Sequence, residues 1–516
     1  MKRFQSLHQP LVGWVLFPLL NSLYNRKGIL PQYLRLIESE RFSEERLREI
    51  QFRKLRILLK YSQQRIPFYA ARFKEIGMDP EDVKELDDIA RIPPLSREEV
   101  VENRLLMVDT RYRDSAQIAD NSLRRPGMPL PLARFRRHRL VRNTSSGSTG
   151  APTVFYEDGS TTALNWGHEL RLKKWFGNSP GAKEARFVRA SNEQVPHLRT
   201  QRWRQMFWNQ LILPGVNLSK ADCEYCHQRL LEFNPTILWG FTSALTAFAD
   251  FLTKTVAGTL SYHPKVVITW AAPLYKHEKE ILSSAFACPV TNIYGMREVG
   301  HVAAFCPSGS LHLNQENFIV ETDNHQVETL TPRSGELLVT TLHRSIMPFI
   351  RYRTGDVGTL DRSQCPCGRT LGVISDFLGR TGEVFWTKTG RLISPNFWCR
   401  TFMDVRLSTS IRRFQIHYLS SDEIRIDIVP DKTFTPDTEG YLLDKLWSDL
   451  SSDIRIDIRK LTEIEAHISG KYQMVVNHQH PEDRNLSFQT TAPATAVHFP
   501  HSARDSCEFR EPDHGY

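Results

Sequence analysis

The feature that most constrains the fold is a nine-residue run of small side chains at 144–152, Thr-Ser-Ser-Gly-Ser-Thr-Gly-Ala-Pro. Small residues let the backbone approach a ligand closely, and successive amides in such a loop can form a concave anion-binding site. A strand-like stretch at 153–156 follows directly, which argues against a flexible linker. The run lacks the lysine of a Walker A loop, which excludes a P-loop NTPase. We therefore predict a phosphate-binding loop. The residues that we expect to bind phosphate are Thr144, Ser145, Ser146, Gly147, Ser148, Thr149 and Gly150.

The chain divides by pattern into three parts. After residue 143, short strands alternate with helices, which is typical of an α/β domain. Near the end, alternating apolar residues at 414–418 and 424–428, a helical stretch at 438–450 and a third alternation at 454–458 indicate a compact α+β unit. We expect an α/β fold with a large multi-layer domain and a small mobile α+β domain. The predicted ranges are 1–378 with an N-terminal helical segment, 379–477 for the small domain, and 478–516 for a disordered tail.

Composition narrows the classes of protein. With 516 residues and 40% hydrophobic content, the chain can form at least two domains. The formal charge of +9 suits an anionic ligand, a nucleic acid or an acidic membrane surface. Apart from a basic run at 134–142, interpreted as a solvated loop, the basic residues are scattered. No arginine-plus-aromatic pattern of an RNA-binding module is present, so we expect no nucleic-acid partner.

The apolar run at 11–20 is interrupted by Gly13 and Pro18. A spanning helix needs roughly 20 apolar residues, so the run is too short. Lys2 and Arg3 precede it as in a signal peptide, but no small-x-small cleavage site follows. The interpretation is a packed or peripheral N-terminal helix, with contact to a membrane left open.

Four further motifs follow the loop in order: Tyr-Gly-Met-Arg-Glu at 294–298, Tyr-Arg-Thr-Gly-Asp at 352–356, Gly-Arg-Thr-Gly-Glu at 379–383 and Ser-Gly-Lys-Tyr at 469–472. Together the five resemble the ordered motifs of the acyl-adenylate-forming superfamily, which includes acyl-CoA synthetases, peptide-synthetase adenylation domains and luciferases.

Within that superfamily, three strings are most similar to the phenylacetate–CoA ligase group and its capsular-polysaccharide-associated, CapK-like relatives. They are Pro-Thr-Ile-Leu-Trp-Gly-Phe-Thr-Ser at 235–243, Met-Pro-Phe-Ile-Arg-Tyr at 347–352 and Cys-Pro-Cys-Gly-Arg at 365–369. The resemblance covers roughly residues 10–477.

The resemblance implies catalytic roles for matched positions. The loop at 144–150 would hold the β- and γ-phosphates of ATP. Glu298 would bind Mg²⁺, a cation that prefers oxygen ligands. Arg380 would contact ribose or phosphate. Lys471 would place its ammonium between the acyl oxygen and the α-phosphate, where it offsets charge in the transition state.

The same resemblance implies a nucleotide and acyl pocket. Tyr294, followed by Gly295, would pack against adenine, and Asp356 would accept hydrogen bonds from both ribose hydroxyls. The remaining candidates are Ala271, Ala272 and Pro273 beside adenine, and Trp239 and Phe241 in an apolar or aryl acyl pocket. Trp239 and Phe241 are equally compatible with core packing.

Two positions depart from the family pattern. Glu383 stands where relatives carry Asp or Lys at the hinge of the small domain, and it keeps a charge there. Ala272 stands where relatives often carry a carboxylate, so its loss puts ordinary nucleotide binding and full activity in question.

The implied reaction is carboxylate plus ATP to acyl-AMP plus pyrophosphate, followed by transfer to coenzyme A. It needs ATP and Mg²⁺, so we expect a cytoplasmic protein. One alternative is an adenylating enzyme whose acceptor is a sugar hydroxyl, an amine or a carrier-protein thiol, as polysaccharide biosynthesis would require. Another is a weakly catalytic nucleotide-binding protein. The sequence specifies neither the acid nor the oligomeric state.

Four cysteine and histidine residues form a separate hypothesis. Cys365 and Cys367 are too close for easy disulfide pairing, and Cys306 and His312 lie shortly after the Tyr-Gly-x-x-Glu motif. If the two loops meet, three thiolates and one imidazole supply a tetrahedral zinc site. The resemblance points the same way, since some phenylacetate-ligase-like proteins hold a structural metal in this region. Four reduced, unliganded side chains are the alternative.

Overall fold

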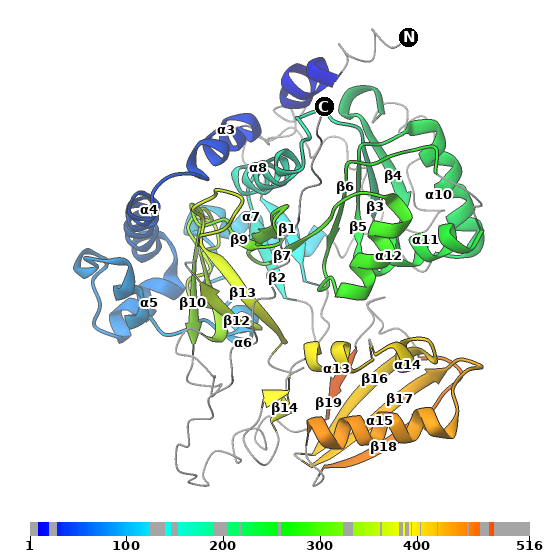
Figure 1. Ribbon diagram of the computed structural model, residues 1–516. Coiled ribbons are helices and arrows are strands. Elements are labelled where there is room, and N and C mark those ends of the chain that lie inside the picture. Colours follow the sequence, from blue (N-terminus) through cyan, green and yellow to red (C-terminus); the bar gives the residue numbers. More distant parts are fainter. Residues whose placement is uncertain are drawn as a thin grey trace, which may run out of the picture.

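The protein is described by a computed structural model (Figure 1). The residues that the structure describes are 9–19, 28–122, 140–145, 153–188, 205–215, 218–255, 260–323, 334–361, 364–380, 385–386, 392–393, 395–402, 404–420, 422–450, 454–464 and 474–478.

The largest element is an 11-stranded sheet with the order β10-β11-β12-β13-β9-β8-β7-β6-β5-β3-β4. Its parallel half consists of β3 (Glu184–Val188), β4 (Gln210–Pro214), β5 (Ile237–Phe241), β6 (Val266–Trp270) and β7 (Val290–Met296). Its antiparallel half consists of β8 (Gly300–Phe305), β9 (Leu311–Leu313), β10 (Phe318–Asp323), β11 (Ser334–Thr341), β12 (Tyr352–Asp361) and β13 (Val373–Arg380). Strand β7 pairs in both senses, so it marks the junction between the halves.

Helices cover both faces of the parallel half, which is why β4, β5 and β6 are largely apolar. The helices are α8 (Gly159–Trp175), α10 (Lys220–Phe233), α11 (Thr242–Thr255) and α12 (Lys276–Phe286). On β5, Leu238 packs with α10, α11 and α12, whereas Ile237 and Trp239 pack with α8. The two sides of the sheet are therefore separate cores. The predicted α/β fold class is confirmed.

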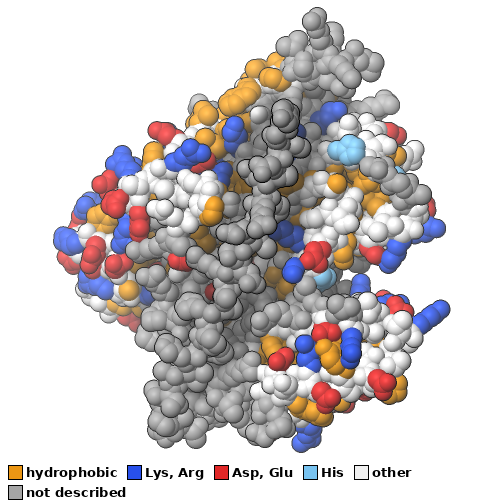
Figure 2. Space-filling model, in the orientation of Figure 1, with side chains coloured by type: hydrophobic (Ala, Val, Ile, Leu, Met, Phe, Trp, Pro, Cys, Tyr) orange, Lys and Arg blue, Asp and Glu red, His pale blue; other side chains and the backbone are white. Residues whose placement is uncertain are grey.

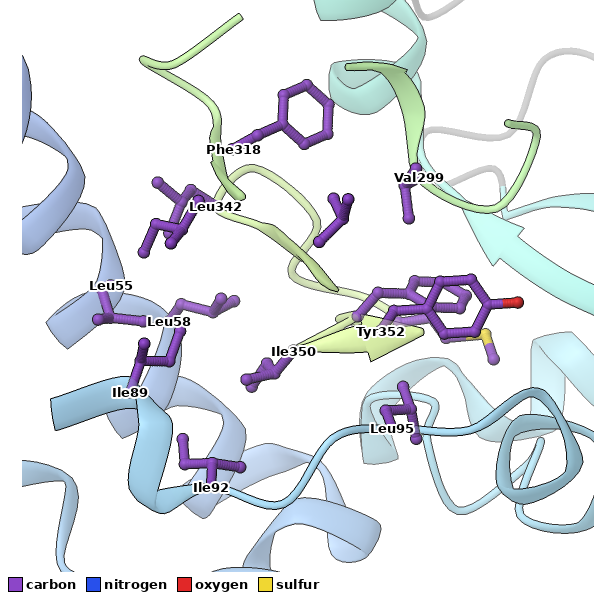
Figure 3. Close-up of a cluster of buried hydrophobic side chains, with 14 of the residues drawn as sticks. Leu55, Leu58, Ile89, Ile92, Leu95, Val299, Phe318, Leu342, Ile350 and Tyr352 are labelled. Carbon is purple, nitrogen blue, oxygen red and sulfur yellow. The ribbon is translucent and has the colours of Figure 1, made fainter. Parts of the chain in front are cut away.

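The part of the chain that the structure describes before residue 123 is mostly helical: residues 55–116 pack on the antiparallel half of the sheet, whereas residues 29–33 pack on α8. Its helices are α3 (Ile29–Ser39), α4 (Glu44–Arg65), α5 (Pro67–Glu75), α6 (Arg97–Glu102) and α7 (Arg113–Ser122), with 3₁₀ turns η2 (Pro80–Asp82), η3 (Leu86–Arg91) and η4 (Thr110–Tyr112). Ser43 caps α4 by accepting a hydrogen bond from the Arg46 amide. Figure 3 shows Leu55 and Leu58 of α4 facing Ile350 and Leu342 in the largest apolar cluster. The N-terminal helical segment predicted from the sequence is present.

The C-terminal part has its own four-stranded sheet, in the order β18-β17-β16-β19. Its elements are β14 (Phe385–Trp386), β15 (Leu392–Ile393), α13 (Pro395–Phe402), α14 (Val405–Ser408), β16 (Ile411–Ser420), β17 (Glu423–Pro430), α15 (Pro436–Asp449), β18 (Arg455–Lys460) and β19 (Val475–Asn477). The predicted strand, strand, helix, strand order is confirmed, and β19 is an addition that the sequence did not indicate. Leu442 and Leu446 of α15 pack on the sheet in a separate apolar cluster.

The exact domain limits remain predictions. Strand β13 carries the large sheet to Arg380, close to the expected division after residue 378. Residues 479–516, the expected disordered tail, lie outside the described residues. Among the helices that the structure describes, none combines the length and hydropathy needed to cross a bilayer.

Charged side chains of α8 are buried rather than solvated. Arg171 and Glu316 are exposed by 1% and 5%, and their atoms Nη1 and Oε1 lie 2.5 Å apart. Ser39 of α3 donates to the same carboxylate at 2.6 Å. These contacts join α8 to both the N-terminal helices and the antiparallel half of the sheet. The buried ion pairs of α8 are Glu169 with Arg186, Arg171 with Glu316, and Lys173 with Glu184.

We expect Glu316→Ala to lower the free energy of unfolding by about 3–5 kcal/mol, because it leaves the Arg171 guanidinium buried without its carboxylate. Thermal unfolding followed by circular dichroism should show a drop of several degrees in the apparent Tm. The control is Glu49→Ala, whose partner Arg46 is exposed by 58%; it should cost less than about 1 kcal/mol. Equal shifts for the two variants would contradict the importance of the buried pair.

Candidate functional site

The candidate site lies at the junction of the two sheet halves, where β6 and β7 end side by side. Ligands of open α/β sheets bind outside the carboxyl ends of strands at such topological switch points. Tyr294 and Gly295 lie on β7 at this edge. A Cβ at Gly295 would lie 2.3 Å from the Gly300 carbonyl oxygen of β8, so this position needs glycine.

Three sequence-predicted residues, carried by the three strands β7, β12 and β13, meet here. Tyr294 Oη donates to Asp356 Oδ2 at 2.9 Å, and Arg380 Nε lies 3.4 Å from Asp356 Oδ1. The pairing of β12 with β13 places Asp356 opposite Arg380, which fixes that contact. The Thr354 hydroxyl accepts from the Asp356 amide at 3.0 Å. Burial and the Asp356 charge hold the pKa of Tyr294 well above its usual value, so the phenol stays a donor.

The start of the small-residue loop is tied to the same site. Arg297, next to Glu298, donates from Nη1 to the Thr144 carbonyl oxygen at 2.8 Å. The base of the loop is closed by Ser145 and Thr153: the Ser145 amide donates to the Thr153 carbonyl, and the Thr153 amide donates to Ser145 Oγ, both at 2.9 Å. The loop begins and ends on the antiparallel pair β1 (Val141–Thr144) and β2 (Val154–Glu157). Glu298 itself is 8% exposed.

Arg344 is a residue of the site that the sequence analysis missed. It is 2% exposed, and its Nη2 lies 3.2 Å from Glu157 Oε2. Burial holds the pKa of Arg344 below its usual value, against the raising effect of Glu157, Asp158 and Glu298. Its Nε and Nη1 atoms have no hydrogen-bond acceptor among the described residues. The sequence carries little signal for it, because Arg344 stands in the polar triplet His-Arg-Ser just before the apolar run at 346–350.

The segment after β6 is held in an unusual backbone conformation. Ala271 has a φ of 69°, in the left-handed region that non-glycine residues rarely adopt. The Ala272 carbonyl accepts from Asn292 Nδ2 of β7 at 3.0 Å and from Thr242 Oγ1 at 3.4 Å. Pro273 is exposed just beyond it. Such local strain is concentrated at functional sites, although the role of these residues stays a prediction.

The two aromatic candidates for the acyl pocket have different surroundings. Trp239 is 3% exposed, with Arg186 Cζ 4.7 Å and Lys173 Nζ 5.1 Å from the centre of its ring. Phe241 lies at the carboxyl end of β5 and stacks on Trp270 with ring centres 4.8 Å apart. The Trp270 indole N–H is buried and has no acceptor among the described groups. The Phe241–Trp270 stack therefore offers an apolar surface with one available donor.

Several predicted site residues lie outside the described residues, so the structure does not place them. They are Ser146, Gly147, Ser148, Thr149, Gly150, Glu383 and Lys471.

The four metal-ligand candidates lie together, beside β9 and the loop before β13. Their ligand atoms all lie within 4.8 Å of one another, with Cys306 Sγ 3.7 Å from Cys365 Sγ and Cys367 Sγ 3.2 Å from His312 Nε2. His312 Nδ1 lies 3.0 Å from the Leu371 carbonyl oxygen, a contact that leaves Nε2 for the cluster. Burial acts to raise the pKa of the Cys365 thiol, but hydrogen bonds around it lower that pKa to about 6.

The sequence of this chain is similar to those of known proteins. Residues 385–478 match the model of the CapK C-terminal domain. The chain is 25% identical over 365 residues to the phenylacetate-coenzyme A ligase of Thermus thermophilus, which covers 67% of this chain and 73% of that protein. It is 22% identical over 301 residues to protein CapK of Staphylococcus aureus, which covers 57% and 62%.

Among solved structures, 2-hydroxyisobutyryl-CoA ligase in the postadenylation state with 2-HIB-AMP superposes with a TM-score of 0.63 at 16% identity, covering 87% of this chain and 93% of that one. The resemblance stated from the motifs is thus confirmed at the level of sequence relatives and of fold.

Proposed function

From its relationship to the phenylacetate–CoA ligases and CapK, we propose that this protein activates a carboxylic acid as an acyl-adenylate, with release of pyrophosphate. The observation that carries the proposal is the contact of Tyr294, Asp356 and Arg380 at the carboxyl end of β7. Three motifs far apart in the sequence supply these side chains, and a nucleotide pocket needs all three in one place.

Asp356 is oriented for a ribose. Its carboxylate is fixed by Tyr294 on one oxygen and by Arg380 near the other. A carboxylate has about four lone-pair sites, so two hydroxyl donors fit beside the existing contacts. The Tyr294 ring then lies against the nucleotide, and its hydroxyl keeps its hydrogen bond to Asp356. Because these groups are already ordered, little reorganisation accompanies binding.

Arg344 and Glu298 fit the phosphate end of the nucleotide. The buried Nε and Nη1 donors of Arg344 are suited to anionic oxygens, and the nearby Glu298 carboxylate is the ligand type that Mg²⁺ prefers. Bound Mg²⁺ would neutralise charge on the phosphates. We propose that Glu298 holds the ion and that the positive charge of the nearby Arg344 attracts the Glu298 carboxylate. Lys471 is proposed to meet the reacting carboxylate and α-phosphate from the small domain.

The acceptor in the second step is proposed to be coenzyme A, which the phenylacetate-coenzyme A ligase relatives use by name. Similarity to CapK keeps a sugar hydroxyl, an amine or a carrier-protein thiol as the second candidate. For the acid, the Phe241–Trp270 stack favours an apolar or aryl group, and the Trp270 N–H favours one that carries a hydrogen-bond acceptor.

We expect ATP–pyrophosphate exchange with one class in a panel of aryl, fatty, hydroxy and amino acids. Lys471→Ala should slow this exchange by about 100-fold or more, because a charge that stabilises the transition state is lost. Asp356→Asn should raise the KM for ATP. The matched controls are Lys279→Ala and Asp376→Asn, which remove exposed charges of the same type elsewhere; both should resemble the unaltered protein.

The outcomes separate the rival functions. ATP binding without exchange for any acid would contradict the proposal and favour a weakly catalytic nucleotide-binding protein. If exchange occurs, release of AMP that depends on coenzyme A assigns the acceptor. Exchange without such release would point to the sugar, amine or carrier-protein acceptor.

We also propose that the cluster of Cys306, His312, Cys365 and Cys367 holds a structural zinc ion. Zinc–sulfur bonds of about 2.3 Å in a tetrahedron place two sulfurs about 3.8 Å apart, and the Cys306 and Cys365 sulfurs are 3.7 Å apart. The ion would link the loop after β8 to the loop before β13, and so hold β8 and β13 in place on either side of β9.

Metal analysis of protein purified without a His tag should find about one zinc per chain. Cys365→Ser/Cys367→Ser should remove the metal and lower the apparent Tm, because two of the four ligands are lost. Cys288→Ser, which changes a cysteine that packs in a different apolar cluster, should keep it. Less than about a tenth of an equivalent in the unaltered protein would contradict a structural zinc site.

A further inference from the structure

A short N-terminal helix over residues 9–19, with π geometry at Val12–Leu16, is fixed to the body of the protein by glycine contacts. A Cβ at Gly13 would lie 2.1 Å from the Pro180 carbonyl oxygen, and one at Gly181 would lie 2.4 Å from the Gln9 carbonyl oxygen. The two backbones therefore touch at a place where no larger residue fits. Phe17 adds an edge-to-face contact with Trp166 of α8, with ring centres 5.6 Å apart.

The opposite side of this helix presents large apolar side chains to solvent. Leu11, Trp14, Val15 and Leu19 are exposed by 48%, 45%, 51% and 57%. Their spacing of three, one and four residues puts them on one face of a helix. Leu34 on α3 is 52% exposed, and Figure 2 shows hydrophobic atoms gathered in a band along the upper edge, over this helix and α3. Single exposed apolar residues are ordinary, but a contiguous band on a fixed element marks an interaction surface.

The sequence that carries this band is basic up to Glu38, an exposed acidic residue on α3. The first 37 residues contain five basic residues and no acidic one. The basic residues are Lys2, Arg3, Arg26, Lys27 and Arg35. An apolar helix face within a basic stretch of sequence matches a surface that is apolar inside and anionic outside.

We propose that the apolar face formed by Leu11, Trp14, Val15, Leu19 and Leu34 binds the surface of an anionic lipid membrane. A helix of 11 residues is about 16 Å long, about half the hydrocarbon thickness, so it lies in the interface instead of crossing the bilayer. A second copy of the chain fits less well: a symmetric contact would bring two basic segments together, and like charges oppose association. The proposal is independent of the adenylating function.

The test uses full-length protein and sedimentation with vesicles of phosphatidylcholine alone or with about one-third phosphatidylglycerol. We expect binding to the anionic vesicles, weakened by salt. Leu11→Ser/Val15→Ser/Leu19→Ser should weaken it by about tenfold or more, because three apolar side chains no longer enter the interface. The control Ile57→Ser/Val101→Ser/Leu231→Ser changes three equally exposed apolar residues elsewhere and should bind as the unaltered protein does.

A charge variant completes the test. Arg26→Gln/Lys27→Gln should lose affinity for anionic vesicles and keep its weak affinity for neutral ones. Equal binding of both triple variants, or equal binding to both vesicle types, would overturn the proposal. So would self-association in analytical ultracentrifugation that only the Leu11/Val15/Leu19 variant abolishes, because the face would then be an interface between copies. Melting curves that match the unaltered protein establish that each variant is folded.

Discussion

The structure depends most on the buried charges of α8. One helix pairs Glu169 and Lys173 with β3 in the parallel half of the sheet, and Arg171 with Glu316 beside the antiparallel half. Each ion is removed from water, a cost that only well-placed partners offset. Few other positions satisfy all these pairs, so the network fixes how the two halves meet. The junction at β7, where the nucleotide motifs lie, is positioned by that constraint.

The site in turn depends on register more than on any single side chain. Asp356 and Arg380 face each other because β12 and β13 pair at those residues, and Tyr294 reaches Asp356 from β7 through the interior of the fold. A zinc ion among the four sulfur and nitrogen ligands would hold β8, β9 and β13 together on the same stretch of sheet. The proposed metal site and the proposed nucleotide pocket therefore lie on the same stretch of sheet and would be positioned together, although their roles differ.

The sequence predicted well what periodicity and motif order encode. Alternating apolar residues at 414–428 became β16 and β17, and motifs separated by more than 50 residues met at one edge. The sequence analysis failed where charged residues are buried in the folded protein. Arg344 and the charges of α8 look like solvent-facing residues, because only tertiary pairing makes their burial tolerable. Strand β19 was missed because three residues give too little pattern. Lys471 and most of the loop at 144–150 lie outside the described residues, so their placement is still inferred from motifs.

Parallel strands also separate the two proposed surfaces. Gly181, which fixes the N-terminal helix, precedes the amino end of β3, whereas Ala271 and Tyr294 lie at the carboxyl ends of β6 and β7. Because β3, β5, β6 and β7 run in the same direction, these features lie at opposite edges of the sheet. Figure 1 shows the N-terminal helix at one end of the molecule and the C-terminal sheet at the other. A membrane bound at the first edge would leave the nucleotide site and the small domain open to water. The protein can therefore bind a membrane and carry out catalysis at the same time, because the two surfaces do not overlap.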